Sequence, residues 1–99
     1  MFLVRDIMYC KPGQSRPMVK KFLALSKLMV PLGFSKMRVM TDVSAERYWT
    51  VVSETEVDNL EKYNDVSRHA MANKEFQEAM AGYHDIVLEG RREIYQIEE

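Results

Sequence analysis

His84 is the side chain of this sequence best suited to acid–base chemistry. It follows Tyr83 at the border of an apolar stripe in the last helical region, formed by Phe76, Met80, Tyr83 and Val87. Because the pKa of an imidazole lies near neutrality, a histidine that reaches a pocket from this border can act as a general base. The alternative interpretation is a surface or capping histidine. Tyr83 beside it is a candidate ligand contact.

Two arginines in predicted strands are candidates to hold an anionic or carbonyl substrate. Arg5 and Asp6 interrupt an apolar strand, and strand alternation places them on opposite faces of the sheet. A charge on a covered face needs a partner, because burying it alone is costly. Arg5 and Arg38 therefore either bind a ligand through their guanidinium groups or form structural ion pairs. Asp6 and Glu54 are the candidate partners, across a dimer.

Trp49 is the only tryptophan of the chain and lies in an aromatic stretch of a predicted strand. It either lines a pocket and stacks on a planar ligand, or fills the core or a dimer interface. The eight methionines have adaptable side chains that suit an apolar pocket, and those on helix stripes suit the core. Cys10 has no His or Asp in a nucleophile pattern, so we expect a small buried thiol.

Composition argues against several kinds of partner. The chain has 14 basic and 15 acidic residues, so it lacks the basic field of a protein that binds nucleic acid or an anionic membrane. A single cysteine favours a reducing cytoplasm. No apolar run approaches the roughly 20 residues of a membrane span. His69 and His84 lie on different helical segments and no glycine-rich phosphate loop occurs, so we expect no metal and no cofactor.

Hydrophobic periodicity predicts the elements that must position these residues. β-forming residues fill Phe2–Cys10, which ends at the turn Lys11-Pro12-Gly13. The helix Gln14–Leu32 follows, with Pro17 in its first turn and Gly33 as its C-cap. Its buried face recurs at steps of three and four residues and consists of Met18, Phe22, Leu25, Met29 and Leu32.

The second half of the chain continues the alternation. Phe34–Thr41 and Arg47–Val57 are predicted to form an antiparallel hairpin, because only a short turn joins them. The remaining elements are a helix that Asp58 caps, a second helical segment that Asn73 begins and Gly90 ends, and a last strand, Arg91–Ile97.

This order predicts one α+β domain over residues 1–99, a ferredoxin-like βαββαβ fold with a four-stranded antiparallel sheet and helices on one face. Adjacent strand residues point to opposite faces, and several adjacent pairs are apolar, so both faces of the sheet are apolar. Leaving the second face in water would forfeit roughly 1.5–3 kcal/mol per large side chain. We therefore expect a homodimer that covers it. The pairs are Leu3 and Val4, Ile7 and Met8, Val39 and Met40, Tyr48 and Trp49, and Val51 and Val52.

Chain length, element order and several segments resemble the dimeric α/β-barrel superfamily, and within it the NIPSNAP-like and antibiotic-biosynthesis-monooxygenase-like domains. The resemblance implies a dimeric α/β barrel with a pocket between the sheet and the helices of each subunit. The segments that carry it are Lys11-Pro12-Gly13, Gly33-Phe34, Arg47-Tyr48-Trp49-Thr50-Val51-Val52, Lys74-Glu75-Phe76-Gln77-Glu78-Ala79-Met80 and Arg91-Arg92-Glu93-Ile94-Tyr95.

The resemblance implies three kinds of function and leaves open whether the protein is an enzyme. The first is binding of a small, largely apolar or aromatic molecule between sheet and helices. The second is a cofactor-independent monooxygenase acting on a phenolic or polycyclic substrate, with His84, Tyr83, Trp49 and Arg5 in the site. The third is an isomerase, cyclase or dehydratase that uses His84 as its base.

Overall fold

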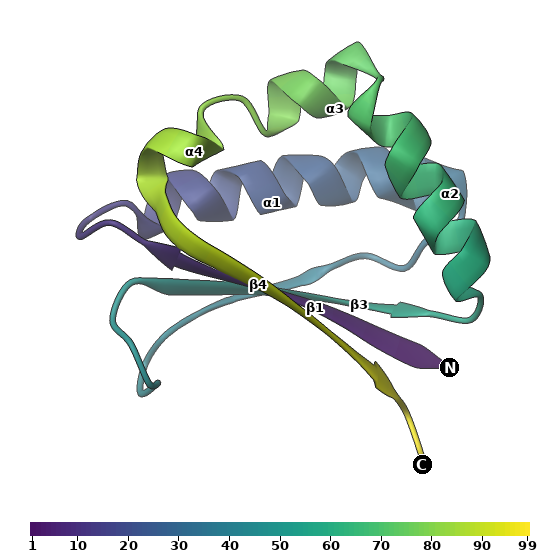
Figure 1. Cartoon of the computed structure of the whole chain (residues 1–99), viewed down its shortest axis with the longest axis horizontal. Coiled ribbons are helices and arrows are strands. Elements are labelled where there is room, and N and C mark those ends of the chain that lie inside the picture. Colours follow the sequence, from purple (N-terminus) through teal and green to yellow (C-terminus); the bar gives the residue numbers. More distant parts are fainter.

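The computed structural model describes the whole chain, Met1–Glu99, as one antiparallel sheet with helices on one face (Figure 1). The elements are β1 Phe2–Cys10, α1 Ser15–Met29, the 3-10 turn η1 Val30–Leu32, β2 Arg38–Thr41, β3 Thr50–Val57, α2 Leu60–Met71, α3 Lys74–Ala79, α4 Tyr83–Ile86 and β4 Val87–Gln96. The strands lie in the order β2-β3-β1-β4. The predicted ferredoxin-like βαββαβ arrangement is confirmed.

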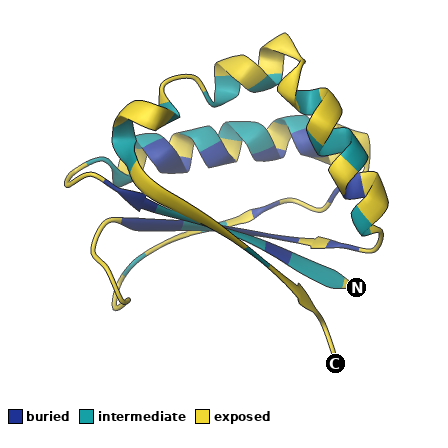
Figure 2. Cartoon of the chain, in the orientation of Figure 1, coloured by how far each residue is buried: buried dark blue, intermediate teal, exposed yellow.

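Alternation gives the central strand β1 two chemically different faces. Val4 packs against Met29 of α1, so its face of the sheet is the one that the helices cover. The register pairs Arg5 with Glu54 of β3 and with Glu93 of β4, and these three side chains therefore share the opposite, open face. Figure 2 shows that β1 and β3 are mostly buried or half-buried, whereas β4 is almost entirely exposed.

The core lies between the sheet and the helices in two clusters. The predicted stripe of α1 is confirmed at Met18, Phe22 and Met29, which are buried, while Leu25 is half-buried. Leu32, predicted for the same stripe, is exposed because it lies in the turn after the helix. One cluster contains Val4, Met29, Phe34, Met37, Val57 and Tyr63, and the other contains Cys10, Met18, Val19, Phe22 and Val51.

The end of α1 depends on proline and glycine. The regular helix stops at Met29, and Pro31 sits in the first turn of η1. Gly33 ends this turn at φ 97°, a left-handed conformation that a residue without Cβ adopts freely. The C-cap role predicted for Gly33 is therefore confirmed, although it closes a 3-10 turn rather than the α-helix itself.

Asparagines begin the next two helices. Asn59, and not the predicted Asp58, caps α2, because its Oδ1 accepts the backbone N–H of Lys62 at 3.0 Å. Asn73 caps α3 as predicted, accepting the N–H of Glu75 at 2.8 Å. None of the helices of the chain combines the length and the apolar character needed to span a membrane.

The predicted hairpin exists but is shorter than expected. β2 begins at Arg38 rather than Phe34, since Phe34 and Met37 are buried in the core and the backbone N–H of Met37 donates to Ser26 Oγ at 3.0 Å. β3 begins at Thr50 rather than Arg47. Tyr48 and Trp49 therefore belong to the β2–β3 connection and not to a strand.

The last strand is longer than predicted. β4 begins at Val87 rather than Arg91, and Gly90 lies inside it instead of ending a helix. A Cβ at position 90 would lie 3.0 Å from Met8 Sδ, so glycine allows β4 to approach β1 closely here.

Truncation of Phe22 should destabilise the protein strongly. Its side chain is 2% exposed in the core, so Phe22→Ala is expected to lower the free energy of unfolding by about 3–5 kcal/mol. Leu23 is the next residue of the same helix and is 42% exposed, so Leu23→Ala should cost about 1 kcal/mol or less. Urea unfolding followed by circular dichroism measures both. Equal losses would contradict the assigned face of α1.

Candidate functional site

The two predicted ligand-binding arginines share one buried carboxylate on the open face. Arg5 Nη2 lies 2.6 Å from Glu54 Oε2, and Arg38 Nη2 lies 2.6 Å from Glu54 Oε1. The Glu54 side chain is only 8% exposed, so both of its oxygens are taken within a single chain. Of the two interpretations, this geometry matches structural ion pairs of Arg5 and Arg38 with Glu54. These pairs form within one chain rather than across a dimer.

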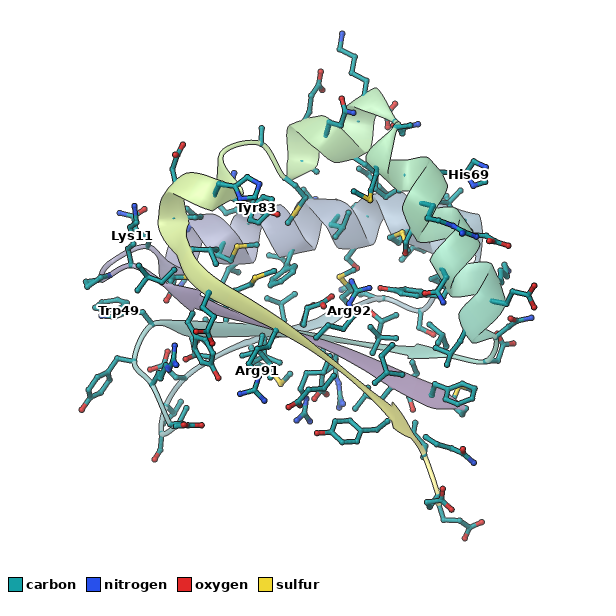
Figure 3. The ribbon with its side chains drawn as sticks, viewed as in Figure 1. Lys11, Trp49, His69, Tyr83, Arg91 and Arg92 are labelled. Carbon is teal, nitrogen blue, oxygen red and sulfur yellow. The ribbon has the colours of Figure 1, made fainter.

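Asp6 forms a separate ion pair on the helix-facing side of the sheet. Its two carboxylate oxygens accept Arg92 Nε at 2.7 Å and Arg92 Nη2 at 3.1 Å. Arg92 also lies over the ring of Tyr63, 5.8 Å from its centroid. The hydrogen bond to Asp6 raises the pKa of Arg92, and burial raises the pKa of Tyr63 against the opposing charge of Arg92. Figure 3 shows Arg92 between the sheet and α2, with Arg91 on the other side of β4.

Arg92 was not among the site residues that the sequence predicted. The usable signal was the pair of adjacent arginines in the last strand, because alternation sends one of them to each face. An arginine on the helix-covered face needs an acidic partner on that face. Asp6, which interrupts the apolar sequence of β1, is this partner.

The predicted acid–base residue lies at the surface. His84 is exposed on α4, and its ring lies against that of Tyr83 with the centroids 4.0 Å apart. Tyr83 is half-buried and packs against the core cluster that contains Cys10. The other histidine, His69, is also exposed, as the sequence predicts. Cys10 is buried and burial raises the pKa of its thiol, which favours the unreactive protonated form at neutral pH.

Trp49 is a predicted ligand contact that lines a pocket. This pocket has a volume of about 430 Å³ and lies between the start of α1 and the β2–β3 connection. Such a volume is within the usual range of small-molecule sites, about 300–1,000 Å³. Arg5, Arg38, Tyr83 and His84 are not among its lining residues, which are Gly13, Ser15, Arg16, Val19, Thr41, Asp42, Tyr48 and Trp49.

The backbone of Trp49 is in an unusual conformation. Its φ of 60° is the only positive value at a residue other than glycine, and a bulky side chain adopts it at a cost of about 1–3 kcal/mol. The strain turns the chain sharply just before β3 and leaves the indole 43% exposed at the pocket. The sequence predicted Trp49 in the middle of a strand, and this prediction is wrong because β3 begins at Thr50. Trp49 nevertheless remains a candidate ligand contact, since it lines the pocket.

Four interactions hold the connection that carries Trp49. Asp42 Oδ1 accepts the backbone N–H of Thr50 at 2.9 Å, and the Thr50 hydroxyl donates to the Arg47 carbonyl at 2.9 Å. The Arg47 guanidinium lies over the ring of Tyr9, 4.1 Å from the centroid, and 3.7 Å from a carboxylate oxygen of Glu89. The pocket wall is therefore tied to the sheet at both ends.

The fold brings together no set of side chains that could bind a metal ion. No group of three or more His, Cys, Asp or Glu side chains lies close enough together to hold a metal ion. The candidate site is the Trp49 pocket, whose lining combines two aromatic side chains, a guanidinium, a carboxylate, two aliphatic hydroxyl side chains and the apolar Val19.

Comparisons with known proteins identify the class of fold. No family model matches the sequence, and no curated protein is significantly similar to it. Among solved structures, a NIPSNAP domain protein from Burkholderia xenovorans superposes with a TM-score of 0.75 at 13% identity, covering 98% of this chain and 94% of that one. A NIPSNAP family protein from Agrobacterium tumefaciens gives 0.74 at 12% identity, covering 96% and 90%.

A "putative antibiotic biosynthesis monooxygenase" from Nitrosomonas europaea gives a TM-score of 0.75 at 10% identity and covers 100% of both chains. The chain thus has the ferredoxin-like α+β fold of NIPSNAP domains and of proteins like antibiotic biosynthesis monooxygenases. The resemblance expected from the sequence is confirmed at the level of fold.

Removal of Arg5 should lower stability and leave the pocket intact. Arg5→Ala takes one of two partners from the buried Glu54 carboxylate, which should cost about 1–3 kcal/mol because Arg38 remains and Arg5 is 35% exposed. Thermal unfolding measures the loss. The matched control is Arg68→Ala, whose exposed pair with Asp65 should be worth about 1 kcal/mol or less. An unchanged melting temperature together with weakened ligand binding would instead make Arg5 a ligand-binding residue.

Proposed function

We propose that the protein binds a small, largely apolar or aromatic molecule, with Trp49 as the principal contact. The observation that carries the proposal is the Trp49 indole, held at a strained positive φ and half-exposed on a pocket of about 430 Å³. Strained backbone of this kind concentrates at ligand sites, where the surrounding structure maintains it. A flat indole offers a stacking surface for a planar ligand.

The position of the pocket agrees with a ligand held between helices and sheet, at one end of that layer. Ser15, Arg16 and Val19 of α1 form one side, and the other side consists of Thr41, Asp42, Tyr48 and Trp49. Of the four ligand contacts predicted from sequence, this proposal retains Trp49. Arg5 and Arg38 are engaged with Glu54, and Tyr83 lies outside the lining.

Several similar structures are named as putative antibiotic biosynthesis monooxygenases, which supports a monooxygenase as the alternative. The sequence suggested a cofactor-independent one. That chemistry requires a proton acceptor beside the bound substrate. His84, the acceptor predicted from sequence, is exposed on α4 and does not line the pocket. We therefore propose binding as the function, and oxygen uptake in the presence of a bound phenol would favour the oxygenase instead.

Binding can be followed directly because Trp49 is the only tryptophan. Titration with 2-naphthamide, 2-naphthoate or another aromatic compound that lacks an indole should quench or shift the Trp49 fluorescence in a saturable way. Trp49→Ala should weaken the binding measured by calorimetry about tenfold or more, since it removes the stacking surface. Leu32 is 44% exposed, close to the 43% of Trp49, but lies in η1 at the opposite end of α1 from the pocket, so Leu32→Ala should bind normally. Equal effects of the two variants would refute the site.

We also propose that the protein is a homodimer that pairs through the open face of the sheet. This face carries Leu3, Ile7, Val52, Met40 and Tyr95, all half-buried or exposed in the single chain. Its central charges are almost balanced, because arginines 5, 38 and 91 contact glutamates 54 and 93. A second copy can cover the centre of this surface without burying an unpaired charge.

Sedimentation velocity at micromolar concentration should give the mass of a dimer. Ile7→Glu adds a charge to the open face next to Val52 and Arg91, and it should shift the protein to monomer. Met71→Glu changes an exposed methionine on the helical side and should leave the dimer intact. A wild-type monomer at these concentrations would contradict the proposal.

A further inference from the structure

The β2–β3 connection, residues 42–49, carries the two most exposed large hydrophobic side chains of the protein. Val43 is 101% exposed and Tyr48 is 86% exposed, and Tyr48 also lines the Trp49 pocket. We propose that the second copy of the chain packs on this connection, so that the partner subunit covers Val43 and Tyr48 and closes each ligand pocket. This step rests on both the proposed dimer and the proposed binding function.

The connection folds back over one end of the open face. The Arg47 guanidinium lies 4.1 Å from the ring centroid of Tyr9 and 3.7 Å from Glu89 Oε1. Tyr9 lies two residues from Ile7 on β1 and pairs with Glu89 of β4, so it belongs to the open face. It is nevertheless only 7% exposed, and Arg47 is the side chain that lies over its ring. Figure 1 shows the connection on the side of the sheet away from the helices, where a second copy on the open face meets it.

Apolar surface continues from the open face towards the connection. Met40 of β2 is 39% exposed and pairs with Val52, which in turn pairs with Ile7 of β1. β2 ends at Thr41, and Val43 follows two residues later. Exposed apolar surface that extends over neighbouring elements in this way marks a site of protein association. The surface available to a partner therefore includes the connection as well as the strands.

The charged residues next to Val43 and Tyr48 already have partners within the chain. Asp42 Oδ1 accepts the backbone N–H of Thr50 at 2.9 Å, and Arg47 is engaged with Tyr9 and Glu89. The surface that covers the connection therefore needs to be apolar rather than strongly charged. The open face of a second copy has this character, because its central arginines and glutamates pair with one another. In a two-fold dimer each connection meets the partner subunit, and the contact forms twice.

Tyr48 joins this contact to the ligand pocket. Its side chain forms part of the lining although most of it faces water, and Trp49 beside it is 43% exposed. An aromatic wall without packing on its outer side must be ordered when a ligand binds, which weakens the affinity. A partner subunit that already holds Tyr48 removes this cost and shields the ligand from water. The dimer should therefore bind an aromatic ligand more tightly than the single chain does.

Replacement of Val43 tests the contact with the partner. Val43→Asp should raise the dimer dissociation constant about tenfold or more in sedimentation velocity, because it places a charge against an apolar surface. Met71→Asp changes a side chain that is 78% exposed on the helical side, and this variant should dimerise like the wild type. Both positions are exposed in the single chain, so circular dichroism should show both variants folded. Equal dimerisation of the two variants would overturn the inference, whereas the open-face dimer, tested by Ile7→Glu, would stand.

Ligand affinity tests whether the partner completes the pocket. The probe is 2-naphthamide, titrated by calorimetry into the dimeric wild type and the monomeric Ile7→Glu variant at the same protein concentration. Residue 7 does not line the pocket, yet the monomeric variant should bind the probe about fivefold more weakly. Equal affinity would overturn the closure of the pocket by the partner and leave the binding site intact. A wild-type monomer would overturn the inference together with the dimer, and failure of both proteins to bind the probe would overturn it together with the binding function.

Discussion

The position of β1 between two antiparallel partners is the constraint on which the rest of the molecule depends. Each side chain of β1 has neighbours on both sides and is committed to one face of the sheet. Arg5 and Asp6 are adjacent, so they must find opposite charges on different faces. Arg5 forms ion pairs with Glu54 and Glu93, and Asp6 forms one with Arg92. A slip of one residue would exchange the faces and leave both charges without partners.

The same alternation separates the core from the charge network. Val4 and its neighbours on the helix face close the hydrophobic layer with α1, while the open face keeps its carboxylate Glu54 nearly buried between two arginines. Arginine suits this arrangement because its planar group makes directional bonds to a carboxylate while part of it stays in water. The ion pairs therefore specify register, and the apolar face supplies most of the folding energy.

Local patterns in the sequence were sufficient for the elements whose limits are set locally. β1 has the predicted bounds, Gly33 closes a helical turn, and Asn73 starts a helix, because β-propensity, glycine geometry and side-chain capping act within a few residues. Trp49 was assigned to a strand because it stands among β-formers. Its positive φ depends on contacts made by the preceding loop, including that of Arg47 with Tyr9, which is distant in sequence.

Trp49 was predicted as a ligand contact, but the other residues of the candidate site were not, for a related reason. Its two walls come from residues 13–19 and 41–49, and no spacing within either segment signals that they meet. The pairing of Arg5 with Glu54 was among the predicted alternatives, because alternation and charge sufficed to suggest it. The ion pair between Asp6 and Arg92 could be identified only from the register of β1 with β4.

The β2–β3 connection is the element that links the two sides of the sheet. Arg47 rests on Tyr9 and reaches Glu89, both on the open face by register, while Tyr48 and Trp49, which follow it directly, line the pocket. Whatever immobilises Arg47 therefore also restricts Trp49 and lowers the entropy that a ligand must remove on binding. A second copy over the open face would act on Arg47 in this way. Because such coupling is reciprocal, ligand in the pocket would strengthen the pairing of subunits to the same extent.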